Sequence, residues 1–286
     1  MYAIELNNVQ KKFDRFSLHI PKLCVEEGYV TGFVGENGAG KTTTIKLIMD
    51  MIFADQGQIR IFGLDSHADA QTIKQDIGYV GEKPGYLEMA SLLEIKKMIA
   101  PFYKNWDETF YRELIRRFSL DERKKYSKLS RGMQKQFQLS LSLAHHPKLI
   151  LMDEPTANLD PIVRGDIIDL LYEQMQQEGV SVFFSTHIIS DLEKIADRLV
   201  FLHKGEILLQ GDKDDIIASH RIVRGDHRLL FPEAEKYLFH IEKSSFGFTA
   251  MTDRYDAVFD LLGKEAVYDR PTLEDIFISR IKGERK

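Results

Sequence analysis

Residues 35–42 read Gly35-Glu36-Asn37-Gly38-Ala39-Gly40-Lys41-Thr42 and match the pattern G-x-x-x-x-G-K-[ST]. Before them, residues 29–34 form a short run of apolar, β-branched and aromatic side chains, which predicts a buried strand. After them, residues 43–51 carry apolar side chains at helical spacing. A glycine-rich loop between a strand and a helix is the setting in which this pattern binds phosphate, so we call residues 35–42 the phosphate loop.

The residue types of the phosphate loop explain what it would bind. Glycines let consecutive backbone N–H groups turn toward a polyphosphate, at the positive end of the following helix. Lys41 is expected to reach the β- and γ-phosphates, and the Thr42 hydroxyl to ligate Mg²⁺. Thr43 is placed to donate to the α-phosphate. The loop therefore predicts a nucleoside triphosphate with Mg²⁺, against the alternative of a glycine-rich turn without a ligand.

Composition narrows the class of protein. The 286 residues allow one or two domains, and the net charge of −5 without a basic block argues against nucleic acid as a partner. Cys24 is the only cysteine, which predicts a reducing compartment. No window is apolar for long enough to span a bilayer, and the first residues lack a secretory signal. We therefore expect a cytoplasmic protein.

The spacing of apolar residues and the local composition predict the order of strands and helices along the chain. Alternation of apolar and polar residues predicts antiparallel strands at 3–6 and 16–20, with residues 11–14 lying between them. Between residues 84 and 147 the chain looks helical, with helices expected at 87–100, 108–118 and 131–145. Within the last of these, residues 137–143 also alternate with period two, so periodicity alone leaves helix and strand open.

The second half alternates strands with helices, which predicts an α/β core with a mostly parallel sheet. The expected elements are strands at 148–153, 180–185, 199–202 and 206–209 and helices at 161–178 and 188–196. Lys204-Gly205 predicts a hairpin between the last two strands. From residue 219 the pattern loosens into a small extension with balanced charge that ends in a charged tail at 282–286.

Two adjacent acids, Asp153 and Glu154, stand at the end of the predicted strand at 148–153. Asp153 would hold Mg²⁺, and Glu154 would act as general base on an attacking water. A purely structural role is the alternative, but two unpaired carboxylates at a strand end are unfavourable without a cation.

In this order, the motifs resemble one family, the ATP-binding subunits of ABC transporters. Leu129-Ser130-Arg131-Gly132-Met133-Gln134 matches the family's signature, with arginine in place of a glycine, and Asp153-Glu154-Pro155-Thr156 follows it. Ala157-Asn158-Leu159-Asp160 resembles the D-loop and Ser185-Thr186-His187 the switch. The resemblance covers residues 2–215 and makes 137–143 part of the signature helix. It implies a P-loop NTPase (RecA-like) core with an antiparallel β subdomain and an inserted helical subdomain at about 84–147. Together these parts form an ATPase domain of residues 1–218, and a small α+β extension follows at 219–286.

The resemblance also implies roles for single residues. Ser130 and Gly132 of one subunit would close on the γ-phosphate bound by the phosphate loop of a second, and Asp160 would communicate across that dimer. His187 would contact the γ-phosphate and hold Glu154, and Phe13 would stack on adenine. Where the family has a glutamine that senses Mg²⁺ and the membrane partner, this chain has Glu82, which we expect to contact the metal.

The expected function is thus an ATPase that works in a pair with a second copy or a related ATPase subunit, on the inner face of the cell membrane beside a separate membrane subunit. Residues 102–107 and 271–277 resemble a subfamily of bacterial exporter ATPases, which implies export. The alternative is a soluble ABC-type ATPase that acts as a nucleotide-gated switch. A binder that does not hydrolyse is disfavoured, because Glu154 is present.

Overall fold

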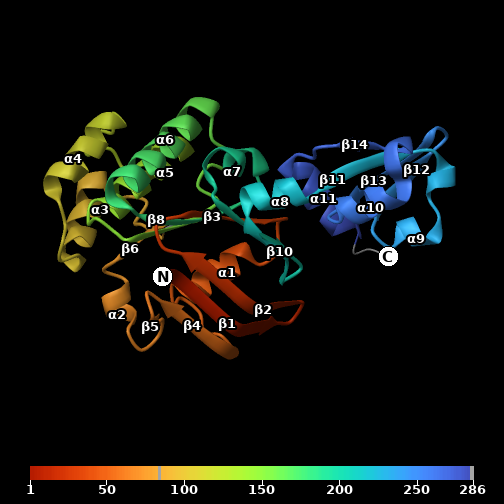
Figure 1. The fold of residues 1–286 in the computed structure, drawn as a ribbon. Coiled ribbons are helices and arrows are strands. Elements are labelled where there is room, and N and C mark those ends of the chain that lie inside the picture. The colour runs from red at the N-terminus through yellow and green to blue at the C-terminus, as the bar shows by residue number, and fades with distance from the viewer. Residues whose placement is uncertain (83–84, 284–286) are drawn as a thin grey trace.

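The central element of the computed structural model, which describes residues 1–82 and 85–283, is a six-stranded sheet (Figure 1). Its strands follow the order β10-β9-β3-β8-β7-β6, and β10 alone runs antiparallel to its neighbour. The strands are β3 (Val30–Gly35), β6 (Ile77–Val80), β7 (Leu149–Asp153), β8 (Ser181–Thr186), β9 (Arg198–His203) and β10 (Glu206–Asp212). Because β3, β7 and β8 are parallel, their carboxyl ends meet at one edge, where ligands bind in open α/β sheets. The mostly parallel sheet predicted from sequence is confirmed.

An antiparallel sheet packs beside it, in the order β2-β1-β4-β5. Its strands are β1 (Tyr2–Phe13), β2 (Phe16–Glu26), β4 (Gln56–Ile61) and β5 (Leu64–Asp65). The prediction that residues 11–14 lie between two short strands was wrong for most of them: β1 continues to Phe13, which pairs with Phe16 across a tight turn. Helix α1 (Lys41–Ile48) lies between the two sheets and buries Ile45 and Leu47.

The helical subdomain confirms the expected run of helices. It contains α3 (Leu92–Ile99), η1 (Ala100–Phe102), α4 (Glu108–Arg117), η2 (Tyr126–Lys128) and α5 (Arg131–Leu143), and the short α2 (Ala70–Ile73) precedes β6. Helix α3 starts later than predicted because Ser91 caps it: the Ser91 hydroxyl accepts from the Glu94 backbone N–H at 3.2 Å, and the Glu94 carboxylate accepts from the Ser91 N–H at 2.7 Å. Residues 137–143 are helical, as the resemblance implied. Pro84, where the subdomain was expected to begin, lies outside the described residues.

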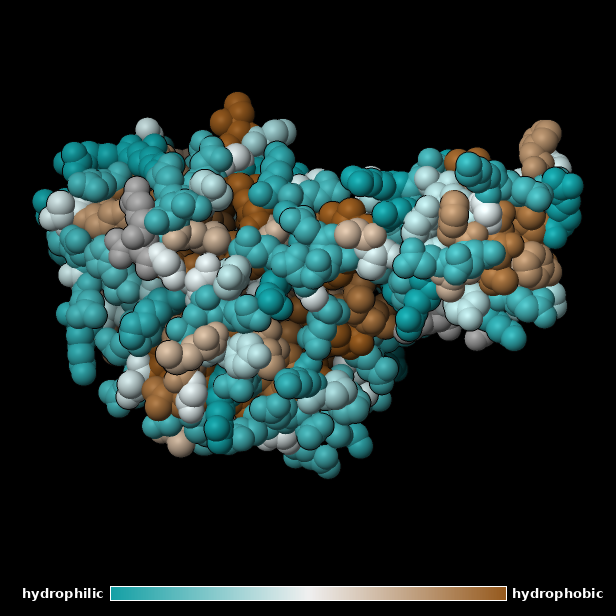
Figure 2. Space-filling model, in the orientation of Figure 1, coloured by the Kyte–Doolittle hydropathy of each residue, from teal (hydrophilic) through white to brown (hydrophobic). Residues whose placement is uncertain are grey.

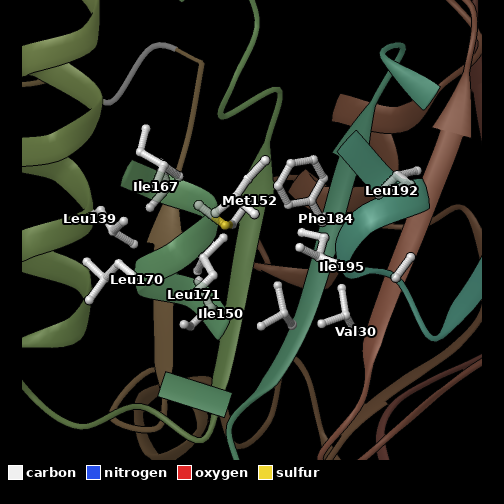
Figure 3. Close-up of a cluster of buried hydrophobic side chains, with 14 of the residues drawn as sticks. Val30, Leu139, Ile150, Met152, Ile167, Leu170, Leu171, Phe184, Leu192 and Ile195 are labelled. Carbon is white, nitrogen blue, oxygen red and sulfur yellow. The ribbon is translucent and has the colours of Figure 1, made fainter. Parts of the chain in front are cut away.

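One large hydrophobic core joins the sheet to the helices above it (Figure 3). Ile150, Met152 and Phe184 from the sheet face Ile167, Leu170 and Leu171 of α6 (Pro161–Glu178). Leu139 of α5 and Leu192 and Ile195 of α7 (Ile189–Ile195) complete this face. The strands that carry the site are therefore fixed by packing on both sides.

The C-terminal extension forms a third sheet, in the order β12-β13-β11-β14. After α8 (Lys213–Ser219), which contacts β10, its elements are β11 (Arg221–Gly225), η3 (His227–Leu229), α9 (Pro232–Glu235), β12 (Phe239–Ser244), β13 (Gly247–Thr252), α10 (Tyr255–Leu262), η4 (Gly263–Glu265), β14 (Val267–Asp269) and α11 (Leu273–Gly283). The extension has its own cluster around Val223, Phe248 and Val258 and projects from the core (Figures 1 and 2). Helix α11 packs back on the central sheet, where the ring centroids of Phe277 and Phe201 lie 5.2 Å apart.

Two features of the chain bear on membranes and on the tail. Among the described residues, every helix is too short or too polar to cross a bilayer. Most of the predicted charged tail, residues 284–286, lies outside the described residues.

Candidate functional site

The phosphate loop joins the carboxyl end of β3 to α1, as predicted. Gly40 caps α1 with a left-handed φ of 113°, and a Cβ at this position would lie 2.9 Å from Phe16 and from Leu18. Gly38 also has a positive φ, of 83°. Side chains are disfavoured at both positions, so the backbone itself lines the start of the helix. This geometry fits a loop that presents N–H groups to phosphate.

Lys41 is buried at the first position of α1. Its ammonium group donates to the Gly35 carbonyl at 2.7 Å and forms an ion pair with Glu154 Oε1 at 3.1 Å. The lysine thus links the phosphate loop to the acid that follows β7. Sequence separation between the two is large, and only the parallel pairing of strands brings them together.

The acid pair sits at the adjoining strand ends. Asp153 is 1% exposed, and its Oδ1 accepts from the Ser185 hydroxyl of β8 at 2.7 Å. Glu154 adopts a left-handed φ of 49°, a conformation that is unfavourable for residues other than glycine and that recurs at functional sites. On the other side, Nδ1 of His187 lies 2.8 Å from Glu154 Oε2. The Glu154 carboxylate is therefore held between Lys41 and His187.

These groups line one cleft of about 910 Å³. The predicted site residues that line it are Phe13, Asn37, Gly38, Gly40, Lys41, Thr42, Thr43, Glu82, Glu154 and His187. Gly35, Glu36 and Ala39 belong to the same loop without lining the cleft, and Asp153 lies buried beside it. Phe13 is 48% exposed at the end of β1, so its ring is available at the rim.

Three further predicted residues, which belong neither to the phosphate loop nor to the acid pair, also do not line this cleft: Ser130, Gly132 and Asp160. Within the chain, Ser130 caps α5 by accepting from the Met133 N–H at 3.2 Å. Asp160 caps α6 by accepting from the Ile162 N–H at 3.1 Å. Within a single chain, Ser130 and Asp160 therefore act as helix caps.

Sequence reasoning missed Lys135, which lines the cleft from α5. It is 8% exposed, and its ammonium donates to the Gly81 carbonyl at 2.6 Å. Burial lowers the pKa of Lys135 to about 8, while the negative charges of Asp153, Glu82 and Glu154 oppose this shift. The sequence carries no local signal of this role, because Lys135 stands among the polar residues Gln134, Gln136 and Gln138.

The residues present fit a magnesium ion held jointly with a nucleotide. The described residues contain no cluster of three or more His, Cys, Asp or Glu that would hold a metal alone. Mg²⁺ ordinarily takes one or two carboxylates and completes its shell with phosphates and water. The Asp153 carboxylate and Thr42 hydroxyl are oxygen donors of this kind. The adjoining phosphate loop would bring the phosphates.

Known proteins resemble this chain in sequence and in fold. The ABC transporter family pattern matches residues 18–157. The ABC transporter ATP-binding protein YtrB of Bacillus subtilis (strain 168) is 28% identical over 99% of both chains. NatA, an ABC transporter ATP-binding protein of the same organism, is 31% identical over 70% of this chain and 83% of its own. A solved ATP-binding subunit of an ABC transporter superposes with a TM-score of 0.68 at 27% identity, over 76% of this chain and 92% of that one.

The chain belongs to the ATP-binding proteins of ABC transporters. It therefore has the P-loop NTPase fold of these cassettes, binds ATP and is an ATPase. The fold class and the family resemblance inferred from sequence are confirmed.

Proposed function

We propose that this chain hydrolyses ATP at the interface of a head-to-tail dimer and that hydrolysis drives export through a separate membrane subunit. The observation that carries the proposal is the Glu154 carboxylate, held in the cleft by Lys41 at 3.1 Å and by His187 at 2.8 Å. A general base needs an oriented carboxylate that reaches the reacting water. Two fixed partners from different strand ends supply that orientation.

The roles of the other residues follow from their positions. Phosphate-loop N–H groups and Lys41 would hold the β- and γ-phosphates, and Phe13 at the rim would stack on adenine. Thr42, Asp153 and Glu82 would hold Mg²⁺, which offsets phosphate charge when bound. Glu154 would accept a proton from the attacking water, and His187 would keep its carboxylate in place and contact the γ-phosphate.

The dimer explains the residues that lie outside the cleft. Ser130 and Arg131 are exposed at the N-terminus of α5, where the helix dipole attracts anions. Arg131 lines the cleft of its own chain, whereas Ser130 does not, so a second subunit is the natural source of the phosphate that Ser130 would meet. Ser130 and Gly132 would then complete the partner's site, and Asp160 would report on it.

A membrane partner is supported by exposed apolar side chains in the segment that follows Glu82 in the sequence. Leu87, Met89 and Phe102 are 63%, 67% and 76% exposed. Large apolar groups on a surface often mark a docking site. The protein would therefore act in the cytoplasm, attached peripherally to the inner face of the membrane. Export as the direction rests on the resemblance of residues 102–107 and 271–277 to exporter ATPases.

The test of hydrolysis is Glu154→Gln. The amide cannot accept a proton as the carboxylate does, so we expect retained ATP binding, turnover at least 100-fold lower and a trapped nucleotide-bound dimer on size-exclusion chromatography. Glu113→Gln makes the same change on the exposed face of α4 and should behave like wild type. Turnover by Glu154→Gln at the wild-type rate would refute the general-base assignment. Lys41→Ala should abolish stabilisation by ATP in a thermal-shift assay.

The membrane partner is tested separately. The tagged chain, expressed with the product of a neighbouring gene that encodes about six membrane-spanning helices, should co-purify with it from detergent. Full ATPase activity without any such partner would instead favour the soluble nucleotide-gated switch.

A further inference from the structure

Lys135 connects two parts of the molecule that approach the cleft from different sides. It lies in the second turn of α5, after the exposed Ser130 and Arg131. Its ammonium donates to the carbonyl of Gly81, which follows β6 directly and precedes Glu82. The hydrogen bond is 2.6 Å long and buried. A charged donor on a buried carbonyl gives a short, strong contact that fixes the geometry of both groups.

Besides Lys135, the cations that line the cleft among the described residues are the buried Lys41 and the exposed Arg15 and Arg131. Glu82 and Glu154 line the cleft and Asp153 lies buried beside it, and all three carboxylates act electrostatically on Lys135. Lys41, the other buried cation of the cleft, is already paired with Glu154. Because Glu82 stands where related ATPases have a neutral glutamine, this chain holds one additional negative charge at the site. A nearby buried cation is what would make that charge tolerable beside phosphates.

We propose that Lys135 is a positioning residue that holds the Gly81–Glu82 turn against α5 and offsets the negative charge of Glu82, so that the carboxylate can stand beside a bound nucleotide. This inference rests on the proposed ATPase site. It assigns a role to a residue outside the family motifs and explains how the chain accommodates Glu82. It also ties the turn to the helix whose N-terminus carries Ser130 and Gly132, so a shift of α5 would move Glu82.

The experiment is a double-mutant cycle on the full-length protein with Lys135→Met, Glu82→Gln and the combined variant. ATP affinity is measured in EDTA by titration calorimetry at pH 7, where no metal masks the carboxylates. We expect Lys135→Met to weaken ATP binding about tenfold, because the cleft then loses one buried cation while its three carboxylates still repel the phosphates. In the combined variant, affinity should return to within threefold of Glu82→Gln alone. The kcat for ATP with Mg²⁺ should follow the same pattern.

Controls separate charge, hydrogen bonding and folding. Lys135→Arg keeps the charge and should bind ATP within threefold of wild type, and Lys124→Met removes an exposed cation and should change nothing. Lys135→Gln keeps a donor for the Gly81 carbonyl without the charge and replaces Lys135→Met in the cycle if that variant does not fold. Equal losses on removing Lys135 with Glu82 and with Gln at position 82 would overturn the proposal. Failure of the wild type to bind ATP would instead contradict the proposed function.

Discussion

Replacing Phe277 with alanine tests whether the C-terminal extension is an integral part of the ATPase core. The Phe277 ring is 8% exposed and meets Phe201 of β9 edge-on, at 5.2 Å between centroids and 81° between planes. Truncation of a buried phenylalanine lowers the free energy of unfolding by about 3–5 kcal/mol. Since this ring lies at the edge of the core, we expect about 3 kcal/mol, which corresponds to a fall in Tm on the order of 6–12 °C for a chain of this size.

The assay is thermal and guanidinium unfolding of the full chain, followed by circular dichroism. Ile278→Ala on the same helix is the matched control, because Ile278 is 38% exposed and should lose less than about 1 kcal/mol. The Kd for ATP should stay within twofold of wild type, since Phe277 does not line the cleft. A loss no larger than that of Ile278→Ala, or a separate early transition for the extension in wild type, would refute the packing argument.

Three further predictions concern the loop, the signature helix and pH. Gly40→Ala should abolish the thermal shift caused by ATP, because the new Cβ would lie 2.9 Å from Phe16 and Leu18 and the φ of residue 40 is left-handed. Gly165→Ala is the control, because a Cβ at this position of α6 meets open space, and this variant should bind ATP as the wild type does. Ser130→Ala should lower the free energy of unfolding by about 1 kcal/mol and reduce ATPase activity, because it removes the N-cap of α5. Ser130→Asn should restore the cap but not the ATPase activity. Restored activity in Ser130→Asn would argue against a contact between the Ser130 hydroxyl and phosphate. Burial lowers the pKa of His145 to about 4, whereas an unfolded histidine titrates near 6.5. The neutral His145 therefore contributes its full share to the free energy of unfolding above pH 6.5, and this contribution should fall by at most about 3 kcal/mol as the pH drops toward 4. In unfolding titrations, His145→Gln should flatten this dependence of the free energy of unfolding on pH.

Local chemistry made much of the fold predictable. The phosphate loop, the buried strand predicted at 148–153 and the helix at 161–178 each carry a strong local pattern, and the structure confirms all three, with the strand at Leu149–Asp153. Boundaries failed where a hydrogen bond outweighs periodicity. The Ser91–Glu94 capping box moves the start of α3, and the tight turn after Phe13 lengthens β1.

The site was predicted in its residues more than in its contacts. Motif chemistry identified Lys41 and Glu154, because phosphate binding and proton transfer require those side chains at those spacings, and the family resemblance identified His187. No local pattern states that Glu154 lies between the other two, since this depends on the parallel pairing of β3, β7 and β8. Lys135 was missed for the same reason: only the packing of α5 against β6 brings its ammonium to the Gly81 carbonyl.

The sequence by itself determined that this chain is an ATP-binding cassette, because the motifs are short, ordered and chemically constrained. The tertiary structure alone decided which charges share the cleft and which residues lie outside it. Burial and distance set the strength of charge interactions, and both arise from contacts between residues far apart in the chain. Glu82 shows this most directly. The sequence did not explain why this chain has a glutamate where the family has a glutamine, and in the structure Glu82 lines the same cleft as the cation of Lys135.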